Sequence, residues 1–256
     1  MLKKYGRYSF LMIIAAAAIL YSCGSQPPEV RFEVASNKGD KLAEENRCED
    51  AVKEYHKAIK INDRNSSTYR KIARCFLKME MIDSAVVYYE GAIIHNPRDI
   101  KAYEDVGDIY FYRQMYHEAM TWFDRALQIG HISPQSYVKL GRIHESWGDN
   151  DMAKGYFEMA LAADSTNNEA LFGIAAIAWI QGDTTTAITN YRKAADEGPN
   201  ALAAYRLGMI YAHQKKYDEA LQWLDKSMKL EPDSELSAEA YQSKMEIIDR
   251  MKAGQK

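Results

Sequence analysis

Residues 66–99 read SSTYRKIARCFLKMEMIDSAVVYYEGAIIHNPRD. Within this stretch Ala85 is followed by Tyr89 four positions later and by Ala92 three positions after that. A second small residue, Ala73, stands twelve positions before Ala85. Offsets of three, four and seven put side chains on one face of an α-helix, whereas a β-strand alternates every second residue. The stretch therefore predicts a hairpin of two amphipathic helices.

The same pattern of small and large residues occurs six times along the chain. Its leading small residues are Ala51, Ala85, Ala119, Ala153, Ala187 and Ala220. They are spaced by 34, 34, 34, 34 and 33 residues. Small residues let paired helices approach closely, and the large residue of each copy fills the space between them. Because a single hairpin cannot cover its own apolar face, this period predicts hairpins that stack on one another.

The second copy carries an aromatic residue, an apolar–small pair, a second aromatic, and then Ala, an aromatic, Ala and Pro. These residues are Tyr69, Ile72, Ala73, Phe76, Ala85, Tyr89, Ala92 and Pro97. Their order resembles the tetratricopeptide repeat (TPR) family. The resemblance implies an all-α fold, a right-handed α-solenoid of six helical hairpins with a concave and a convex surface. We expect the repeats at 32–65, 66–99, 100–133, 134–167, 168–200 and 201–234.

Residues 235–252 carry one more amphipathic pattern, in which Leu236, Ala240 and Ile247 share an apolar stripe. A stack of hairpins leaves its last apolar face bare, and an amphipathic helix covers such a face. We therefore predict that 235–256 is a C-terminal capping helix with a short tail. A helix that binds a partner is the alternative.

The N-terminus has the pattern of a signal peptide. Basic residues at positions 3, 4 and 7 precede an apolar run of 11 residues from Phe10 to Leu20. A membrane-spanning helix needs about 20 apolar residues, so this run is too short to be a permanent anchor. The sequence Leu20-Tyr21-Ser22-Cys23 resembles the lipobox of bacterial lipoproteins. An ordinary secretory signal with an unrelated cysteine is the alternative.

This second resemblance implies that residues 1–22 are removed as a lipoprotein signal peptide and that Cys23 receives acyl chains. Residues 23–31 would then be a short extended tether. Several acyl chains hold a protein firmly on a membrane, whereas one holds it only marginally. Gly24, in place of an aspartate after the lipidated cysteine, implies sorting to the outer membrane. We thus expect a palmitate-bearing lipoprotein of the cell envelope, on the periplasmic face or at the surface.

The composition suits a globular protein, because 47% of the 256 residues are hydrophobic and 27% are charged. The formal net charge of -3, with basic residues interleaved among acidic ones, argues against nucleic-acid binding. Without residues 1–22 and the lipidated cysteine, two cysteines remain, Cys48 and Cys75. The repeat register places them on neighbouring helices, either as buried thiols or as a disulfide.

No motif in the sequence predicts catalysis or a cofactor. The six histidines form no His-Glu-x-x-His pair, and no cysteine pair has the spacing of a metal site. The sequence also lacks a phosphate-binding loop and a Gly-x-Ser-x-Gly elbow. Neighbouring carboxylates such as Glu44-Glu45 fall at expected turns, where solvated side chains are the simpler interpretation. We therefore expect no catalytic residue, no metal and no cofactor.

In the TPR family, ligands commonly lie along the concave face, which the first helix of each repeat lines. Helical geometry assigns residues of this chain to that face. Arg70, Arg74 and Lys139 match three of the five positions with which some family members hold a C-terminal carboxylate. Asp105 and Gln135 depart from the pattern and argue against that function. Because charge alternates between repeats, mutual neutralisation of neighbouring repeats is the alternative interpretation.

The same face becomes aromatic and apolar in the later repeats. The candidate partner-binding residues there are Phe172, Trp179, Ile180, Tyr205 and Met209, and the third repeat adds Phe111 and Tyr112. An exposed apolar patch lowers solubility unless something covers it. We expect a protein or peptide partner to cover the patch, with the C-terminal helix as the alternative.

Together these features predict a lipid-anchored TPR scaffold that mediates protein–protein interactions in envelope complex assembly or secretion. The protein resembles outer-membrane lipoproteins that act as secretin pilotins, as accessory subunits of barrel assembly or as adaptors for peptidoglycan hydrolases. In architecture it is most similar to the type IV pilus pilotins. A binding protein for a small ligand or glycan, with aromatic side chains as stacking platforms, is the alternative. The sequence leaves homo-oligomerisation open.

Overall fold

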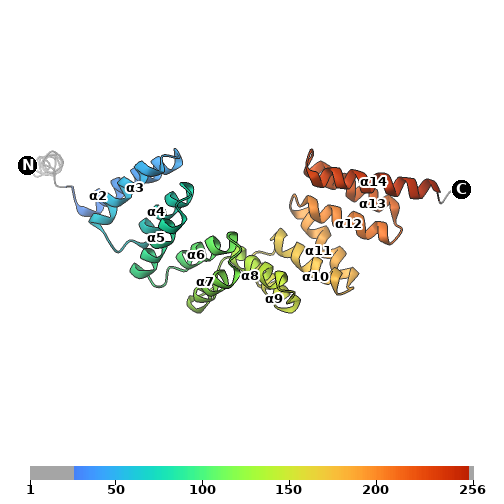
Figure 1. Ribbon diagram of the computed structural model, residues 1–256, viewed down its shortest axis with the longest axis horizontal. Coiled ribbons are helices and arrows are strands. Elements are labelled where there is room, and N and C mark those ends of the chain that lie inside the picture. Colours follow the sequence, from blue (N-terminus) through green and yellow to red (C-terminus); the bar gives the residue numbers. More distant parts are fainter. Residues whose placement is uncertain (1–25, 254–256) are drawn as a thin grey trace, which may run out of the picture. The chain divides into compact units, whose positions relative to one another are not determined.

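The computed structural model describes residues 26–253, which form thirteen α-helices and no strand (Figure 1). The predicted signal peptide and Cys23 lie outside these described residues. The helices are α2 (Pro28–Glu44), α3 (Cys48–Ile61), α4 (Ser66–Lys78), α5 (Ile82–His95), α6 (Ile100–Tyr112), α7 (Tyr116–Ile129), α8 (Pro134–Ser146), α9 (Asn150–Ala163), α10 (Asn168–Ile180), α11 (Thr184–Glu197), α12 (Ala201–His213), α13 (Tyr217–Leu230) and α14 (Glu235–Ala253). From α3 to α13 the lengths alternate regularly between 14 and 13 residues.

The helices belong to two compact units whose boundary in the sequence falls inside α6, between Ile109 and Tyr110. In the N-terminal unit, α2 packs on α3, α3 on α4 and α4 on α5. In the C-terminal unit the same sequential packing runs from α7 to α14. These consecutive helices thus contact one another, as expected for stacked hairpins.

The turn inside each hairpin places one residue in the left-handed region of backbone conformation. Gly148 and Gly182 occupy this position with φ of 78° and 82°. The other four hairpins use non-glycine residues with φ from 59° to 61°, namely Asn46, Glu80, Gln114 and Lys215. For a residue other than glycine, this conformation costs about 1–2 kcal/mol of conformational energy. The packing of the paired helices therefore holds the turn residue in this conformation. Glycine occupies the position in only two of the six hairpins, so glycines alone would not locate all six turns.

α2 begins at Pro28, so the expected extended conformation of segment 23–31 is wrong for its last four residues. Proline is favoured in the first turn of a helix because its φ is already helical and its missing N–H needs no partner there. Glu29 in the same turn is placed favourably toward the positive end of the helix dipole. The first hairpin therefore starts four residues before position 32.

The core of the C-terminal unit contains a ring that fills the space left by two glycines. Phe157 on α9 is 1% exposed. A Cβ atom added at Gly141 on α8 would come within 2.7 Å of this ring, and one added at Gly173 on α10 would overlap it. Both glycines therefore make room for one aromatic side chain, which connects the α8–α9 hairpin with the next helix.

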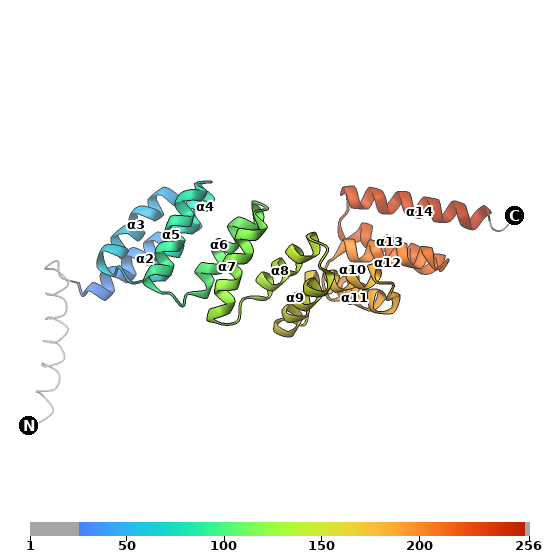
Figure 2. The same ribbon diagram turned by 60° about the horizontal axis from the view of Figure 1, so that its bottom comes forward.

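α14 packs against α12 and α13 at the end of the C-terminal unit (Figure 2). Its Ala240 and Ile247 are 0% and 3% exposed and belong to the core of that unit. Lys244 Nζ on α14 also lies 2.6 Å from Asp225 Oδ1 on α13. The helix thus caps the last hairpin as predicted. None of the described helices is both long enough and apolar enough to cross a membrane.

Cys48 and Cys75 are free thiols in the core of the N-terminal unit, with 6% and 2% exposure. Burial, reinforced by the neighbouring Cys48, raises the pKa of the Cys75 thiol to about 12. A thiol with a raised pKa forms little thiolate and reacts slowly. The sequence left open whether these two cysteines are buried thiols or a disulfide, and in the structure they are buried thiols.

Candidate partner-binding site

Two first helices of hairpins, α10 and α12, leave apolar side chains at the surface of the C-terminal unit. α10 has the sequence NEALFGIAAIAWI, which is apolar after Glu169. Its inner face fills the core, yet Trp179 and Ile180 at its C-terminal end are 40% and 67% exposed. Met209 on α12 is 39% exposed. Exposed apolar side chains that lie together mark an interaction site.

A pocket of about 320 Å³ opens beside Trp179 and Met209, whereas Ile180 does not line it. The Trp179 indole packs edge-on against the His213 ring, with 6.2 Å between the ring centroids. The pocket is lined by Trp179, Tyr191, Arg206, Met209, Ile210, Ala212, His213 and Arg250, from α10, α11, α12 and α14. Its volume is at the lower end of ligand-pocket sizes, which suits the side chains of a partner segment.

Phe172 and Tyr205 differ from Trp179 in their surroundings. Phe172 is half-buried and lies edge-on to Tyr191, with 5.3 Å between the ring centroids. The Tyr205 hydroxyl lies 3.5 Å from Ser243 Oγ on α14. The capping helix therefore covers the Tyr205 side of the predicted patch. The exposed remainder is Trp179, Ile180 and Met209, which we call the Trp179 surface.

Phe111 and Tyr112, at the end of α6, border a second pocket of about 410 Å³. Tyr112 is 74% exposed, and Lys139 Nζ on α8 lies 5.4 Å from the centroid of its ring. Arg142 also lines this pocket, but Glu169 neutralises it at 2.8 Å. The lining is mainly charged and amide side chains, so this second surface is more polar than the Trp179 surface.

The basic side chains predicted to line a groove in the second repeat are engaged within the N-terminal unit. Arg70 Nε lies 3.0 Å from Asp99 Oδ2, and these side chains are 17% and 8% exposed. Arg74 Nη2 lies 3.4 Å from Asp105 Oδ2. Burial raises the pKa of Asp105, and the charges of Arg74 and Arg70 oppose that shift. The structure thus places Arg70 in a largely buried ion pair rather than at an open surface.

Lys71 on the same helix pairs with a residue of the preceding hairpin. Lys71 Nζ on α4 lies 2.7 Å from Asp40 Oδ2 on α2. The basic residues of α4 therefore face acidic residues of both the preceding and the following hairpin. The Arg74–Asp105 and Lys71–Asp40 pairs thus confirm the alternative interpretation, that neighbouring repeats neutralise one another, whereas Asp99 lies in the same expected repeat as Arg70.

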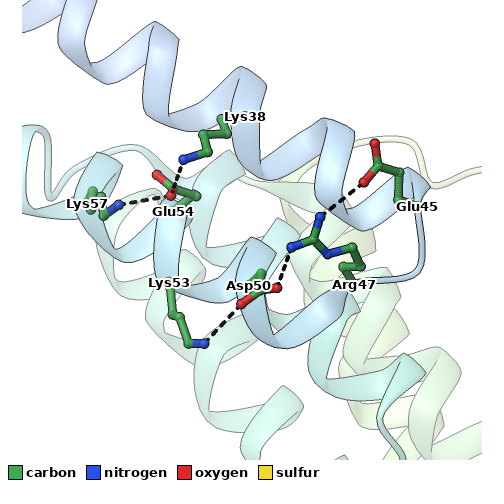
Figure 3. Close-up of polar contacts among 7 residues, drawn as sticks. All are labelled: Lys38, Glu45, Arg47, Asp50, Lys53, Glu54 and Lys57. Atoms are coloured by element: carbon green, nitrogen blue, oxygen red, sulfur yellow. Dashed lines mark hydrogen bonds and ion pairs between the residues drawn. The ribbon is translucent and has the colours of Figure 1, made fainter.

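Charged side chains where α2 meets α3 form further ion pairs (Figure 3). Lys38 and Lys57 both lie within 3 Å of Glu54 Oε1, at 2.8 and 2.9 Å, and lower the pKa of that carboxyl. Asp50 pairs with Arg47 at 2.8 Å. The Arg47–Asp50 pair is exposed, and exposed pairs contribute less than ~1 kcal/mol each. Across residues 26–253 no group of three or more His, Cys, Asp or Glu side chains could hold a metal ion.

Sequence patterns did not single out Arg206, His213 or Arg250 as site residues. Arg206 is an exposed residue of an otherwise apolar helix, and Arg250 lies off the apolar stripe of α14, where a solvated charge is the ordinary expectation. Both nevertheless line the pocket beside Trp179. Only the packing of α14 on α12 brings them to one place, so no local signal could have identified them.

The helices form pairs that repeat about every 34 residues, and the turn inside each pair contains one residue in the left-handed backbone conformation. Such a repetition of helix pairs defines a helical-repeat protein. The family model described as tetratricopeptide repeat matches residues 138–201 and 178–235. These residues, which include the Trp179 surface, match the tetratricopeptide repeat model, and the described helices share the fold of solved TPR structures. No curated protein sequence matches the chain.

Several solved structures share this fold along most of the chain. YrrB, a TPR protein with an unusual peptide-binding site, is 24% identical over 73% of this chain and 97% of its own, with a TM-score of 0.58. PilF of Pseudomonas aeruginosa is 18% identical over 85% and 99%, with a TM-score of 0.69. PilW, a widely conserved type IV pilus biogenesis factor, is 16% identical over 82% and 98%, with a TM-score of 0.65. At these identities the likeness shows the fold alone.

Proposed function

We propose that this protein is a lipid-anchored TPR adaptor that binds a protein or peptide partner at the Trp179 surface. The observation that carries the proposal is the exposure of Trp179, Ile180 and Met209, of which Trp179 and Met209 line a pocket. Removing apolar area from water favours association by about 25 cal/mol per Å². Aromatic side chains that fill pockets in an interface typically account for about 2 kcal/mol or more each. Binding a partner is the physical use to which this surface is best suited.

The structural neighbours support the use of this fold as a protein-binding scaffold. YrrB is a TPR protein with a peptide-binding site, and PilW is a type IV pilus biogenesis factor. We infer that this chain likewise serves the assembly of an envelope complex or secretion, in the manner of a pilotin.

The lipid anchor is the second part of the proposal. The basic start, the apolar run from Phe10 to Leu20 and the lipobox-like sequence ending at Cys23 support it. Removal of residues 1–22 leaves 30 basic and 36 acidic residues. Such an acidic protein is repelled by anionic lipids. Acyl chains at Cys23 would supply the attachment that electrostatics does not.

Trp179→Ala is expected to lose the partner that the unaltered protein retains in cells. The substitution removes the largest exposed apolar side chain of the Trp179 surface, while the core stays intact. The test is crosslinking in cells, followed by affinity recovery of the tagged chain and mass spectrometry. Trp147→Ala is the matched control, because Trp147 is 41% exposed and Trp179 is 40% exposed. Trp147 does not line the pocket.

A partner that is recovered equally well with both variants contradicts the proposed surface. Loss of the partner with both variants would show a nonspecific effect of removing an exposed indole, and it contradicts the surface as well. Loss with Trp179→Ala alone supports it, and the identity of the recovered protein then indicates the assembly pathway.

Cys23→Ala is expected to abolish incorporation of labelled palmitate and to leave residues 1–22 attached. The acyl group of a lipoprotein is attached through the cysteine thiol, which alanine lacks. Metabolic labelling and the intact mass of the recovered protein measure the two effects. Cys48→Ala, which removes a buried thiol, should keep the label. Label on the Cys23→Ala variant would show that the anchor is elsewhere.

A further inference from the structure

The pocket at the Trp179 surface combines an apolar wall with positive charge. Its apolar side is formed by Trp179, Met209 and Ile210. Its polar side carries the guanidinium groups of Arg206 on α12 and Arg250 on α14, together with His213. No carboxylate lines the pocket, although the chain has 36 acidic residues against 33 basic ones. The pocket is thus locally positive on an acidic protein.

The two guanidinium groups are not neutralised within the described part of the chain. Arg70, Arg74 and Arg142 each pair with a carboxylate at 3.0, 3.4 and 2.8 Å respectively. Arg206 and Arg250 have no ion pair with any residue of 26–253, and both are exposed. Two unpaired guanidinium groups beside one pocket both attract an anionic ligand.

We propose that the pocket binds an acidic peptide segment in which an apolar, preferably aromatic, side chain lies next to carboxylate side chains. The aromatic side chain would enter the pocket against Trp179, and the carboxylates would accept hydrogen bonds from Arg206 and Arg250. Guanidinium groups bind carboxylates through paired, charge-assisted hydrogen bonds. The inference rests on the proposed function and adds the chemistry of the partner. It also gives the capping helix a part in recognition, because Arg250 lies on α14.

The test uses the full chain in mild detergent, labelled with 5-fluorotryptophan, which gives one ¹⁹F signal for each of the four tryptophans. Trp179→Phe identifies the signal at the pocket. The probe is a synthetic peptide with one phenylalanine between two pairs of glutamates, blocked at both ends so that it has no terminal carboxylate. Two matched peptides replace the glutamates with glutamine or the phenylalanine with alanine. Titration is followed at the Trp179 signal.

The acidic probe is expected to shift the Trp179 signal, and both matched peptides should bind at least about tenfold more weakly. Arg206→Gln combined with Arg250→Gln should weaken the binding of the acidic probe by a similar factor of about ten. The control is Arg64→Gln combined with Arg98→Gln, which removes the same charge from exposed positions outside the pocket. This control should bind the probe like the unaltered chain.

Three results would overturn the proposal: no shift of the Trp179 signal, equal binding of the glutamine peptide, or equal binding by the Arg206/Arg250 variant. The crosslinking comparison keeps this failure separate from failure of the adaptor function. Suppose that Trp179→Ala loses its cellular partner, but that neither the glutamine peptide nor the Arg206/Arg250 variant changes the affinity for the probe. The adaptor function then stands, and the preference for an acidic peptide is rejected. If the probe binds as expected while Trp179→Ala keeps its partners, the adaptor role of this surface is rejected instead.

Discussion

Phe157→Ala is expected to lower the free energy of unfolding of the C-terminal unit by about 3–5 kcal/mol. The ring is 1% exposed and occupies the space left by the missing side chains of Gly141 and Gly173. Neither glycine has a side chain that could move into the cavity, so the lost contacts are not replaced. The cost should therefore lie near the upper part of the range for truncation of a buried phenylalanine.

Urea denaturation followed by tryptophan fluorescence measures this effect. The four tryptophans are at positions 122, 147, 179 and 223, all in the unit that begins at Tyr110. Fluorescence thus reports on the unit that contains Phe157. Tyr112→Ala is the control in the same unit, because Tyr112 is 74% exposed and should cost less than about 0.5 kcal/mol.

A loss below about 1 kcal/mol for Phe157→Ala would mean that the neighbouring helices close the cavity. That result would contradict the role assigned to Gly141 and Gly173 as spacers for one ring. Helix packing would then be more adaptable than the glycine contacts indicate.

Arg70→Met is expected to destabilise the N-terminal unit by about 3 kcal/mol or more. Asp99, its partner at 3.0 Å, has a side chain that is only 8% exposed. Removing the guanidinium leaves a buried carboxylate without its counter-charge, which costs far more than the loss of an exposed pair. Arg74→Met should cost less than about 1 kcal/mol, because the Arg74 side chain is 56% exposed.

The buried thiols of the same unit give the readout. Cys48 and Cys75 are free and buried, so thiol labelling during urea denaturation, read by mass spectrometry, reports on unfolding of the N-terminal unit. Adding Asp99→Asn to Arg70→Met should recover part of the loss, since it removes the unpaired charge. Equal effects of Arg70→Met and Arg74→Met, with no recovery by Asp99→Asn, would show that the Arg70 ion pair is not a special support of this unit.

The site residues predicted from sequence patterns differ in how the structure places them. Arg70 was predicted at a ligand-binding face because its position matches the family pattern, yet Asp99 engages it. Trp179, Ile180 and Met209 were predicted from the apolar face of their helices. All three are exposed, and Trp179 and Met209 line a pocket. Phe172 and Tyr205 belong to the same predicted face but pack into the core or against α14.

Local patterns in the sequence were enough to establish the hairpins, their 34-residue step and the capping helix. Helical periodicity is a local property, because the offsets of three, four and seven follow from the geometry of a single helix. The small and large residues that let two helices approach also recur at fixed positions, so stacking could be deduced without coordinates. The resemblance to tetratricopeptide repeats rests on this local information.

Which charges are neutralised and which remain available to a partner depends on how the helices pack. Arg70 and Arg74 pair with Asp99 and Asp105, whereas Arg206 and Arg250 converge on one pocket without a carboxylate. An ion pair across hairpins depends on side-chain direction and on the separation of helices that are distant in the chain. A periodic sequence pattern does not contain those quantities. The sequence therefore predicted an apolar surface, whereas the packing of α14 on α12 determined which charged side chains line its pocket.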